Sequence, residues 1–323
     1  MKLAIYGCGN VARGVELAAA QAPDVALVCA FTRREPSGVR MLTGVPVRAT
    51  AELDAHLGEF DVLAICGGSA TDLPELTPML AAKCSVVDSF DTHARIPEHF
   101  ARVDAAAKAG GHVALIAGGW DPGLFSLARL YAAAVLPDGE SCTVWGRGVS
   151  QGHSDAVRRV PGVLDARQYT VPIPEALEAA RRGETPTARE LHRREVYVVA
   201  AAGADRAAIE RTIVTMPDYF AGYDTRVTFV TAEEMARDHA ALPHGGAVLR
   251  AGKTGLHGEH RHTVEYRLTL DSNPEFTGGV LVALARAVDK MARRGETGCR
   301  TVFDVAPAEL SSLPAAALRA RVL

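Results

Sequence analysis

KLAIYGCGNVA, residues 2–12, is the stretch that decides the fold of this chain. Its first half is an apolar run typical of a buried strand, and the Ala-rich segment from Val11 to Ala22 has a helical pattern. The GxGxxA motif therefore lies where a strand turns into a helix, which is the context in which it binds a dinucleotide. Gly7 permits the tight turn, and Gly9 lets the backbone approach a pyrophosphate. A purely structural strand-to-helix turn is the alternative interpretation.

Further apolar runs alternate with helical patterns up to about residue 119. Strands are expected at 25–31, 62–66, 86–87 and 113–117, and helices at 73–82 and 97–109. Continuous apolar strands that alternate with helices predict a parallel sheet covered by helices on both faces. The predicted fold class is α/β, with a Rossmann-type doubly wound parallel sheet and a second α+β domain for substrate binding and dimerisation.

The pattern changes beyond Trp120. A helix is expected at 124–136, followed by β-branched runs at 143–145, 196–199, 226–230 and 263–270, and by a long helix at 276–294. Turn residues separate the β-branched runs, so a mixed or antiparallel sheet is predicted. We therefore expect a dinucleotide-binding domain over residues 1–119, to which about 296–323 return, and a substrate-binding and dimerisation domain over 120–295. The second sheet and the long helix are expected to provide a surface for self-association.

Composition argues against several classes of protein. The 323 residues are 48% hydrophobic and carry a formal net charge of −3, which gives no basic surplus for a nucleic acid or an anionic membrane. No signal peptide or membrane-spanning run is expected. The six cysteines form no CxxC pair, so neither a zinc ribbon nor another metal site is expected. Most lie in apolar runs as reduced thiols, which favours a cytoplasmic protein.

The end of the second strand indicates which dinucleotide binds. An NAD site carries an acidic residue there to hold the ribose hydroxyls. This chain has Thr32, Arg33 and Arg34 instead, whose hydroxyl and guanidinium groups complement a 2′-phosphate. NADP is therefore the predicted cofactor, and a solvated arginine pair on a loop is the alternative. The third strand ends in the small-residue loop GGSAT, residues 67–71, at the edge where open α/β sheets bind ligands.

Motifs through the rest of the chain resemble one family of oxidoreductases. They are DSFDTH (88–93), GGWDPG (118–123), WGRGVSQGHSDAVRRVPGV (145–163), MPDYFAGY (216–223), PHGG (243–246), HTVEY (262–266) and Asn273-Pro274. Together with YGCGN, TRR and GGSATD they resemble meso-diaminopimelate dehydrogenase, in order and with similar spacing over nearly the whole chain. The residue patterns by themselves lead only to an NADP-dependent oxidoreductase of two domains.

The resemblance implies reversible, NADP-dependent oxidative deamination of meso-2,6-diaminopimelate at its D-centre, in a cytoplasmic homodimer. The product, L-2-amino-6-oxopimelate, cyclises to tetrahydrodipicolinate, and ammonia is released. In reverse, the reaction serves lysine and peptidoglycan precursor biosynthesis. The substrate carries two ammonium and two carboxylate groups, which carboxylate side chains and an arginine fork complement. Anchoring the distal end orients the D-centre for reaction.

The resemblance also assigns the residues of the site. Cofactor contacts are expected from Gly7, Cys8, Gly9, Asn10 and Val11 at the pyrophosphate, from Thr32, Arg33 and Arg34 at the 2′-phosphate, and from Ser69, Ala70, Thr71, Ser89, Phe90, Asp91, Trp120, Asp121 and Pro122 along the rest of the cleft. The catalytic residues expected beside the D-centre are Asp91 and Asp121, with substrate contacts from Trp120, Trp145, Gln151 and Gly152. The distal L-centre is expected to contact Thr170, Arg194, His244 and Asn273.

Several of these residues have simpler interpretations. Asp121 is also placed to cap the helix expected near Leu124. Trp145 is also typical of a core strand, and Arg194 lies in HRRE, a charged run of the kind that is usually solvated. An aspartate or His153 is expected to take the proton of the amine, and the residues alone do not choose between them.

Two positions depart from the family pattern. LHGEHR, residues 256–261, is longer than the usual loop and is expected to be an exposed insertion, with a metal site at its two histidines as the alternative. Arg147 stands where a proline or small residue is expected. Two other functions stay open: an enzyme of the same build with a different substrate, and a non-enzymatic NADP-sensing regulator. The presence of Asp91, Asp121 and Arg194 argues against the regulator.

Overall fold

The computed structural model describes all 323 residues, which form two compact units. Unit 1 comprises Met1–Leu127 and Pro274–Leu323, and unit 2 comprises Ala128–Asn273. The functional boundaries expected from the sequence, 1–119 and 120–295, stay a prediction. None of the helices has both the length and the apolar character needed to cross a bilayer.

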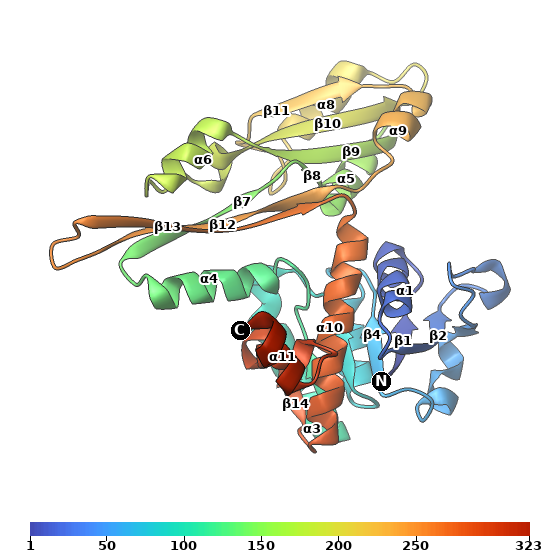
Figure 1. Ribbon diagram of the computed structural model, residues 1–323. Helices are drawn as coiled ribbons and strands as arrows, with labels where there is room; N and C mark the ends of the chain where they lie inside the picture. Colours follow the sequence, from blue (N-terminus) through green and yellow to red (C-terminus); the bar gives the residue numbers. More distant parts are fainter. The chain divides into compact units, whose positions relative to one another are not determined.

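A parallel sheet of seven strands forms the centre of unit 1, in the order β14-β6-β5-β4-β1-β2-β3 (Figure 1). The strand β1 lies between β2 and β4, so the strand order reverses its direction at β1. Ligands of open α/β sheets bind at such a reversal, outside the carboxyl ends of the strands. The predicted Rossmann-type fold is therefore confirmed. The strands are β1 (Lys2–Tyr6), β2 (Ala26–Thr32), β3 (Val47–Ala49), β4 (Val62–Ile65), β5 (Val86–Asp88), β6 (Val113–Leu115) and β14 (Gly298–Arg300).

Helices pack on both faces of this sheet and bury two apolar clusters. One cluster receives α1 and α10, and the other receives α2 and α3. Gly14 and Gly278 let α1 and α10 cross closely, because a Cβ at Gly14 would lie 2.1 Å from the Pro274 carbonyl oxygen. The helix α10 therefore contributes its apolar face to the core of unit 1. The helices are α1 (Asn10–Gln21), α2 (Leu73–Ala81), α3 (Ile96–Gly110), α10 (Asn273–Arg293) and α11 (Ala315–Val322), with 3-10 turns η1 (Pro36–Gly38), η2 (Thr50–His56), η3 (His93–Arg95), η4 (Val302–Asp304) and η5 (Pro307–Leu310).

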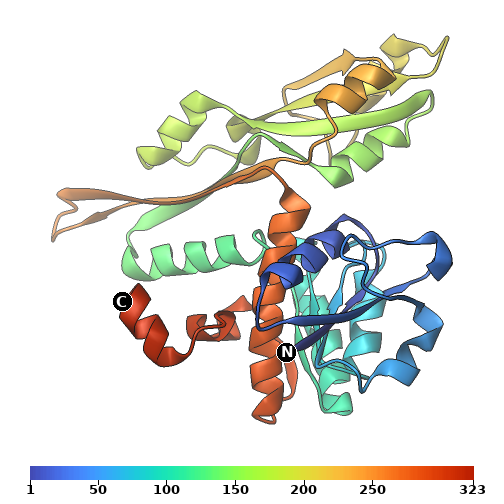
Figure 2. The same ribbon diagram turned by 45° about the vertical axis from the view of Figure 1, so that its right-hand side comes forward.

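Unit 2 contains two sheets, one in the order β11-β10-β9-β8 and one in the order β13-β12-β7. The strand β10 is antiparallel to β9 and parallel to β11, so the predicted mixed sheet is confirmed. The strands β12 and β13 form the long hairpin that projects from unit 2 in Figures 1 and 2. The strands are β7 (Gly139–Trp145), β8 (Gly148–Val149), β9 (Val163–Pro172), β10 (His192–Ala200), β11 (Thr225–Phe229), β12 (His244–Thr254) and β13 (His260–Leu270). The helices are α4 (Leu124–Val135), which starts in unit 1, α5 (Gln151–Arg158), α6 (Pro174–Arg181), α7 (Ala188–Leu191), α8 (Arg206–Val214) and α9 (Ala232–Asp238).

The sequence does not predict β9 or β12. The strand β9 mixes Asp165, Arg167 and Gln168 with apolar residues, and this hides the alternation of a strand. The strand β12 contains three glycines, which are typical of turns. At Gly246 a Cβ would lie 2.4 Å from the Val144 carbonyl oxygen of β7, so this glycine permits close approach of the neighbouring strand.

Candidate active site

The GxGxxA segment forms the turn between β1 and α1. Gly7 has φ +107°, and a Cβ there would lie 2.7 Å from the Cys66 carbonyl oxygen, so the turn requires glycine. Gly9 is the N-cap residue of α1, where no side chain caps the helix, and a Cβ at Gly9 would enter open space. The first amide groups of α1, from Asn10 and Val11 onward, are therefore available to an anion. This geometry fits the pyrophosphate of a dinucleotide.

Thr32, Arg33 and Arg34 lie at the carboxyl end of β2, beside this turn. Thr32 is buried and its Oγ1 accepts a hydrogen bond from the Arg34 amide at 3.1 Å. The Arg34 guanidinium donates to the Cys8 carbonyl oxygen at 3.3 Å. The Arg33 guanidinium is exposed and forms two hydrogen bonds with the Asp72 carboxylate, at 3.0 and 3.2 Å. The structure thus brings two cations to the carboxyl end of β2, beside the turn between β1 and α1.

Asp72 is a residue that the sequence-based site does not include. One of its carboxylate oxygens also accepts the Gly68 amide at 2.9 Å, so the loop after β4 is tied to Arg33. In the same loop, the Ser69 hydroxyl accepts the Asp91 amide at 2.8 Å. The sequence could have indicated Asp72, because this aspartate of the motif GGSATD follows a small-residue loop at the edge of the sheet where ligands bind. The side chains of Ala70 and Thr71 are exposed.

Asp91 and Asp121 belong to loops that follow the neighbouring strands β5 and β6. Both loops leave the carboxyl edge of the same sheet, where the dinucleotide turn also lies. Asp91 is exposed and Ser89 is half-buried, whereas the Phe90 side chain is buried and stacks on His99 at 4.2 Å between ring centroids. Phe90 therefore has only its backbone available to a cofactor.

The second of these loops, GGWDPG, is a tight closed turn before α4. Gly119 pairs with Gly123, whose φ is +128°, and a Cβ at Gly123 would lie 1.8 Å from the Gly119 carbonyl oxygen. Trp120 is buried and packs edge-to-face on Phe125 at 5.2 Å. Because α4 begins at Leu124, Gly123 holds the N-cap position. Asp121 lies two residues earlier and is followed by Pro122.

Arg194 is the central charge of unit 2. It lies on β10 opposite Thr170 of β9, and only 6% of it is exposed. Its Nη1 donates a hydrogen bond to the Thr170 hydroxyl, Tyr223 is a further hydrogen-bond partner of the guanidinium, and its Nε has no partner. The Tyr223 ring lies 4.2 Å from the guanidinium carbon, no carboxylate pairs with it, and burial lowers the pKa of Arg194. A buried cation without an anion is costly, so an anionic ligand would stabilise Arg194 here.

His244 and Asn273 lie in the neighbourhood of this pair. Gly148 of β8 is opposite Thr170, and a Cβ at Gly148 would lie 2.6 Å from the His244 ring. The His244 ring therefore lies against the strand residue next to Thr170. The backbone amide of Asn273 donates to the carbonyl oxygen of Leu242 at 3.0 Å, and Leu242 lies two residues before His244. The structure thus gathers the four residues expected at the distal centre in one part of unit 2.

Gln151 and Gly152 form the exposed first turn of α5, and a Cβ at Gly152 would meet nothing within 4 Å. His153 follows them, with Nδ1 2.8 Å from the hydroxyl of the N-cap residue, Ser150. Its ring packs edge-to-face on Tyr219 at 5.2 Å. Burial and then the charge of Arg194 lower the pKa of His153 to about 4. At neutral pH the His153 imidazole is therefore uncharged.

Trp145 is held by His192, a residue that the sequence-based site misses. The Trp145 amide donates to His192 Nε2 at 2.9 Å, and His192 Nδ1 donates to the Ala188 carbonyl oxygen at 2.9 Å. Burial lowers the pKa of His192, in keeping with this neutral tautomer. The alternation of buried and exposed residues in HRRE buries His192 and Arg194 and exposes Arg193. Because side chains alternate between the two faces of a strand, Arg194 is buried although it lies in a run of charged residues.

The two departures from the family pattern lie away from Arg194. Arg147 pairs with Glu195 at 2.8 Å and lies over the Tyr169 ring at 5.0 Å, on the face of β9 and β10 opposite to Arg194. Residues 255–259 form the turn between β12 and β13, where Leu256 is 90% exposed, and His260 and Arg261 are the first residues of β13. No group of three or more His, Cys, Asp or Glu side chains is arranged to hold a metal.

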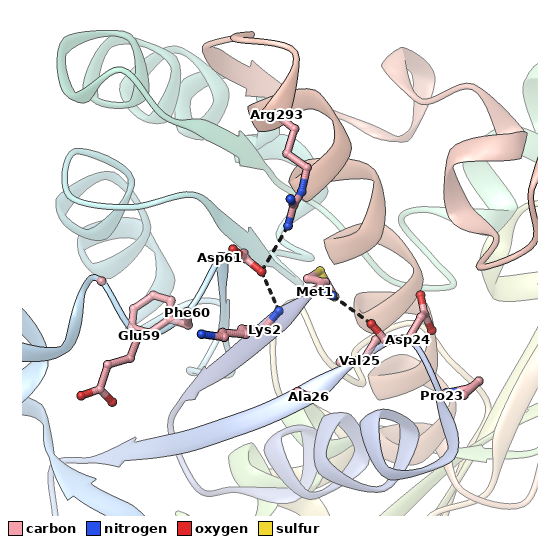
Figure 3. Close-up of a pocket in the computed structure, with 11 residues that line it drawn as sticks. Met1, Lys2, Pro23, Asp24, Val25, Ala26, Glu59, Phe60, Asp61 and Arg293 are labelled. Carbon is pink, nitrogen blue, oxygen red and sulfur yellow. Dashed lines mark hydrogen bonds and ion pairs between the residues drawn. The ribbon is translucent and has the colours of Figure 1, made fainter.

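A separate pocket of about 450 Å³ lies at the amino ends of β1 and β2 (Figure 3). Two interactions join groups of its lining: the Met1 amine donates to the Asp24 carbonyl oxygen at 2.9 Å, and Arg293 pairs with Asp61 at 3.5 Å. The pocket lies at the opposite edge of the sheet from the dinucleotide turn, so it is distinct from the candidate site.

The fold and these residues define a class: a Rossmann-type oxidoreductase that uses a nicotinamide dinucleotide. Comparison with known proteins specifies the family. Residues 119–272 match the diaminopimelic acid dehydrogenase C-terminal domain. The chain is 50% identical over 326 residues to meso-diaminopimelate D-dehydrogenase of Acetivibrio thermocellus, a match that covers 100% of this chain and 98% of that protein. This chain belongs to the meso-diaminopimelate D-dehydrogenase family and is a dehydrogenase.

Two solved structures share the fold over the whole chain. The Corynebacterium glutamicum DAP dehydrogenase in complex with DAP has a TM-score of 0.93 and 46% identity, with coverage of 100% of this chain and 99% of that one. An engineered D-amino acid dehydrogenase bound to NADP⁺ has a TM-score of 0.89 and 45% identity, with the same coverage. The Corynebacterium glutamicum sequence itself is 47% identical over 313 residues, 96% of this chain and 95% of that protein.

Proposed function

We propose that this enzyme catalyses the reversible, NADP-dependent oxidative deamination of meso-2,6-diaminopimelate at its D-centre. The products are ammonium, NADPH and L-2-amino-6-oxopimelate, which cyclises to tetrahydrodipicolinate, and the reverse reaction serves lysine and peptidoglycan precursor biosynthesis. The observation that carries this proposal is the buried Arg194, whose Nε has no partner and which pairs with no carboxylate. A distal substrate carboxylate supplies the missing anion. The relatives named for this reaction and the DAP complex of a close structural neighbour support it.

The reacting end requires groups that bind an ammonium and accept a proton. Oxidation at the D-centre takes a hydride from the α-carbon and a proton from the ammonium, and water then converts the iminium to a ketone and ammonium. NADP, when bound, accepts the hydride. Asp91 and Asp121, on loops at one edge of the sheet, complement the ammonium, and one of them takes its proton. Trp120, Trp145, Gln151 and Gly152 complete the contacts that we assign to this end.

The distal end requires groups that recognise an unreacting amino acid. The guanidinium of Arg194 and the hydroxyl of Thr170 bind its carboxylate, with His244 and Asn273 on the remaining polar groups. Both ends of the substrate carry the same groups and differ only in handedness. Separate contacts for each end therefore decide which centre is oxidised.

The direct test of this function compares three stereoisomers in parallel. NADPH formation is followed with meso-, LL- and DD-diaminopimelate at equal concentrations. We expect the meso isomer to react fastest and the LL isomer, which has no D-centre, to be inert. Turnover of a simple D-amino acid without turnover of meso-diaminopimelate would assign a different substrate to the same fold.

Cofactor choice gives a prediction at the end of β2. Replacing Arg33 and Arg34 with Gln should weaken NADP binding far more than NAD binding, because each lost charge-assisted hydrogen bond contributes about 1.5–3 kcal/mol. Steady-state KM values for both dinucleotides measure the effect. Arg102→Gln removes an exposed cation that pairs with Glu75 and is the matched control. A wild-type enzyme that prefers NAD would contradict the assignment of a 2′-phosphate site.

Assembly gives a further prediction in unit 2. The strand β13 is an edge strand of eleven residues, and its Val264 and Tyr266 are 38% and 40% exposed. A long exposed edge strand is a template for pairing with a second chain, so we expect a homodimer formed through β13. Sedimentation at micromolar concentration measures the mass, and Val264→Lys should weaken the association. A stable monomer would refute this prediction, whereas a hexamer would refute only the number of subunits.

The cysteines bear on the compartment in which the enzyme works. All six are free thiols, and burial raises the pKa of Cys84 to about 12. Reduced thiols that no disulfide joins suit a reducing compartment, so we place the enzyme in the cytoplasm. We assign it a small-molecule substrate and neither a nucleic acid nor a membrane as partner, in keeping with its net charge of −3.

A further inference from the structure

Asp88 is the last residue of β5, and its side chain is fully buried beneath the carboxyl edge of the sheet. Its carboxylate accepts four hydrogen bonds from four different segments of unit 1. Each carboxylate oxygen accepts two of them, and a carboxylate has about four acceptor sites in all. No assigned contact to cofactor or substrate involves this residue.

The two oxygens of Asp88 bind different parts of the unit. Oδ1 accepts the amides of Phe90 at 3.1 Å and Ala117 at 3.0 Å. These amides belong to the loops that carry Asp91 and Asp121, one and four residues further along the chain. The Asp88 carbonyl oxygen also accepts the Gly118 amide at 2.8 Å. One residue therefore connects both loops.

The other oxygen, Oδ2, anchors this connection to the helices. It accepts the Thr77 hydroxyl of α2 at 2.8 Å and Nε2 of His99 of α3 at 2.9 Å. His99 in turn stacks on Phe90, with 4.2 Å between ring centroids. The loop of Asp91 is thus held through both its backbone and a side chain.

Ala117, in the second loop, has a backbone conformation that needs support from its surroundings. Its φ is +56°, in the left-handed region that alanine disfavours. Such a conformation persists only where the surrounding structure fixes it. The hydrogen bond from the Ala117 amide to Asp88 is one contact that fixes it.

We propose that Asp88 is a positioning residue that sets the separation and orientation of the Asp91 and Asp121 loops at the reacting centre. The role rests on the proposed function, because it concerns the two carboxylates assigned to the ammonium. Asp88 does not touch the substrate. It acts by holding two backbone amides with one charged acceptor, and charge-assisted hydrogen bonds are about twice as strong as neutral ones.

The test compares Asp88→Asn with Thr77→Val. Asparagine keeps the size of the side chain but removes the charge that holds the two loop amides. Thr77→Val removes one donor to Oδ2 and leaves both loop bonds in place, so it controls for lost stability. We expect Asp88→Asn to lower kcat for meso-diaminopimelate by roughly 10- to 100-fold, since misplacement by about 1 Å can cost that much. The KM for NADP should stay within about twofold, and Thr77→Val should keep kcat within about twofold at a similar loss of Tm.

Amide hydrogen exchange provides a readout that does not require turnover. In the wild type, the amides of Phe90 and Ala117 should exchange as slowly as core strand amides, and Asp88→Asn should speed both by at least about tenfold. Fast exchange of both amides in the wild type would overturn the proposal, even if the variant does not fold. Equal losses of kcat in the two variants, in proportion to Tm, would also overturn it. A wild type inactive on meso-diaminopimelate would refute the proposed substrate, and the exchange rates would still decide the role of Asp88.

Discussion

Replacing Arg194 with Met raises the activation free energy for meso-diaminopimelate by about 2–5 kcal/mol, which lowers kcat/KM roughly 30-fold to several thousand-fold. The reason is that Arg194 is buried, its hydrogen-bond partners are the Thr170 hydroxyl and Tyr223, and no carboxylate pairs with it, so we assign the distal carboxylate as its counter-ion. Met has a similar length and no charge, so it removes the carboxylate receptor while filling the space. Steady-state kinetics with saturating NADP measure the loss.

Short D-amino acids separate this role from a general loss of function. They have no distal carboxylate, so Arg194→Met should spare or improve their turnover. Arg193→Met is the matched control, because Arg193 is the exposed neighbour on the other face of β10 and pairs with Glu195. If Arg194→Met lowers both activities equally, the assignment of the distal end fails.

Replacing Asp121 with Asn lowers the turnover of meso-diaminopimelate and of short D-amino acids together. Both substrates place an ammonium at the reacting centre, where we assign Asp121 to bind it and to take part in removing its proton. Loss of a group that transfers a proton in the transition state typically costs about 10²- to 10⁴-fold. The measurement is kcat for both substrates, together with the KM for NADP.

Asp54→Asn is the control for a lost carboxylate in unit 1. Asp54 is exposed and pairs with Lys83 at 2.7 Å, on the segment between β3 and β4. It should leave kcat unchanged within about twofold. If Asp121→Asn leaves both activities intact, Asp121 is a structural residue of the turn before α4, and another group must act at the D-centre.

The cofactor half of the site could be predicted from the sequence because its signals are local. The turn that needs Gly7 and the open space at Gly9 are properties of one strand-to-helix segment. Arg33 and Arg34 follow directly from the end of the next strand. What the local sequence does not show is the contact between Asp72 and Arg33, which joins residues 39 positions apart.

The substrate half depends on contacts between strands, which a single sequence does not display. Thr170 and Arg194 become neighbours only through the register of β9 and β10, and β9 itself is hidden by its polar residues. The burial of Arg194 follows from that pairing. Asp88 was visible as the first residue of DSFDTH, but its four donors come from α2, α3 and two loops. Only the fold brings them to one carboxylate.

The central claim is that NADP-dependent oxidation occurs at the D-centre while the L-centre is held by unit 2. It is tested most directly with meso-diaminopimelate that carries deuterium on one α-carbon at a time. Deuterium on the D-centre should appear in the reduced cofactor and should slow the reaction if hydride transfer limits the rate. Deuterium on the L-centre should remain in the product, L-2-amino-6-oxopimelate. Transfer of the label from the L-centre, or retention of the D-centre label in the product, would contradict the account.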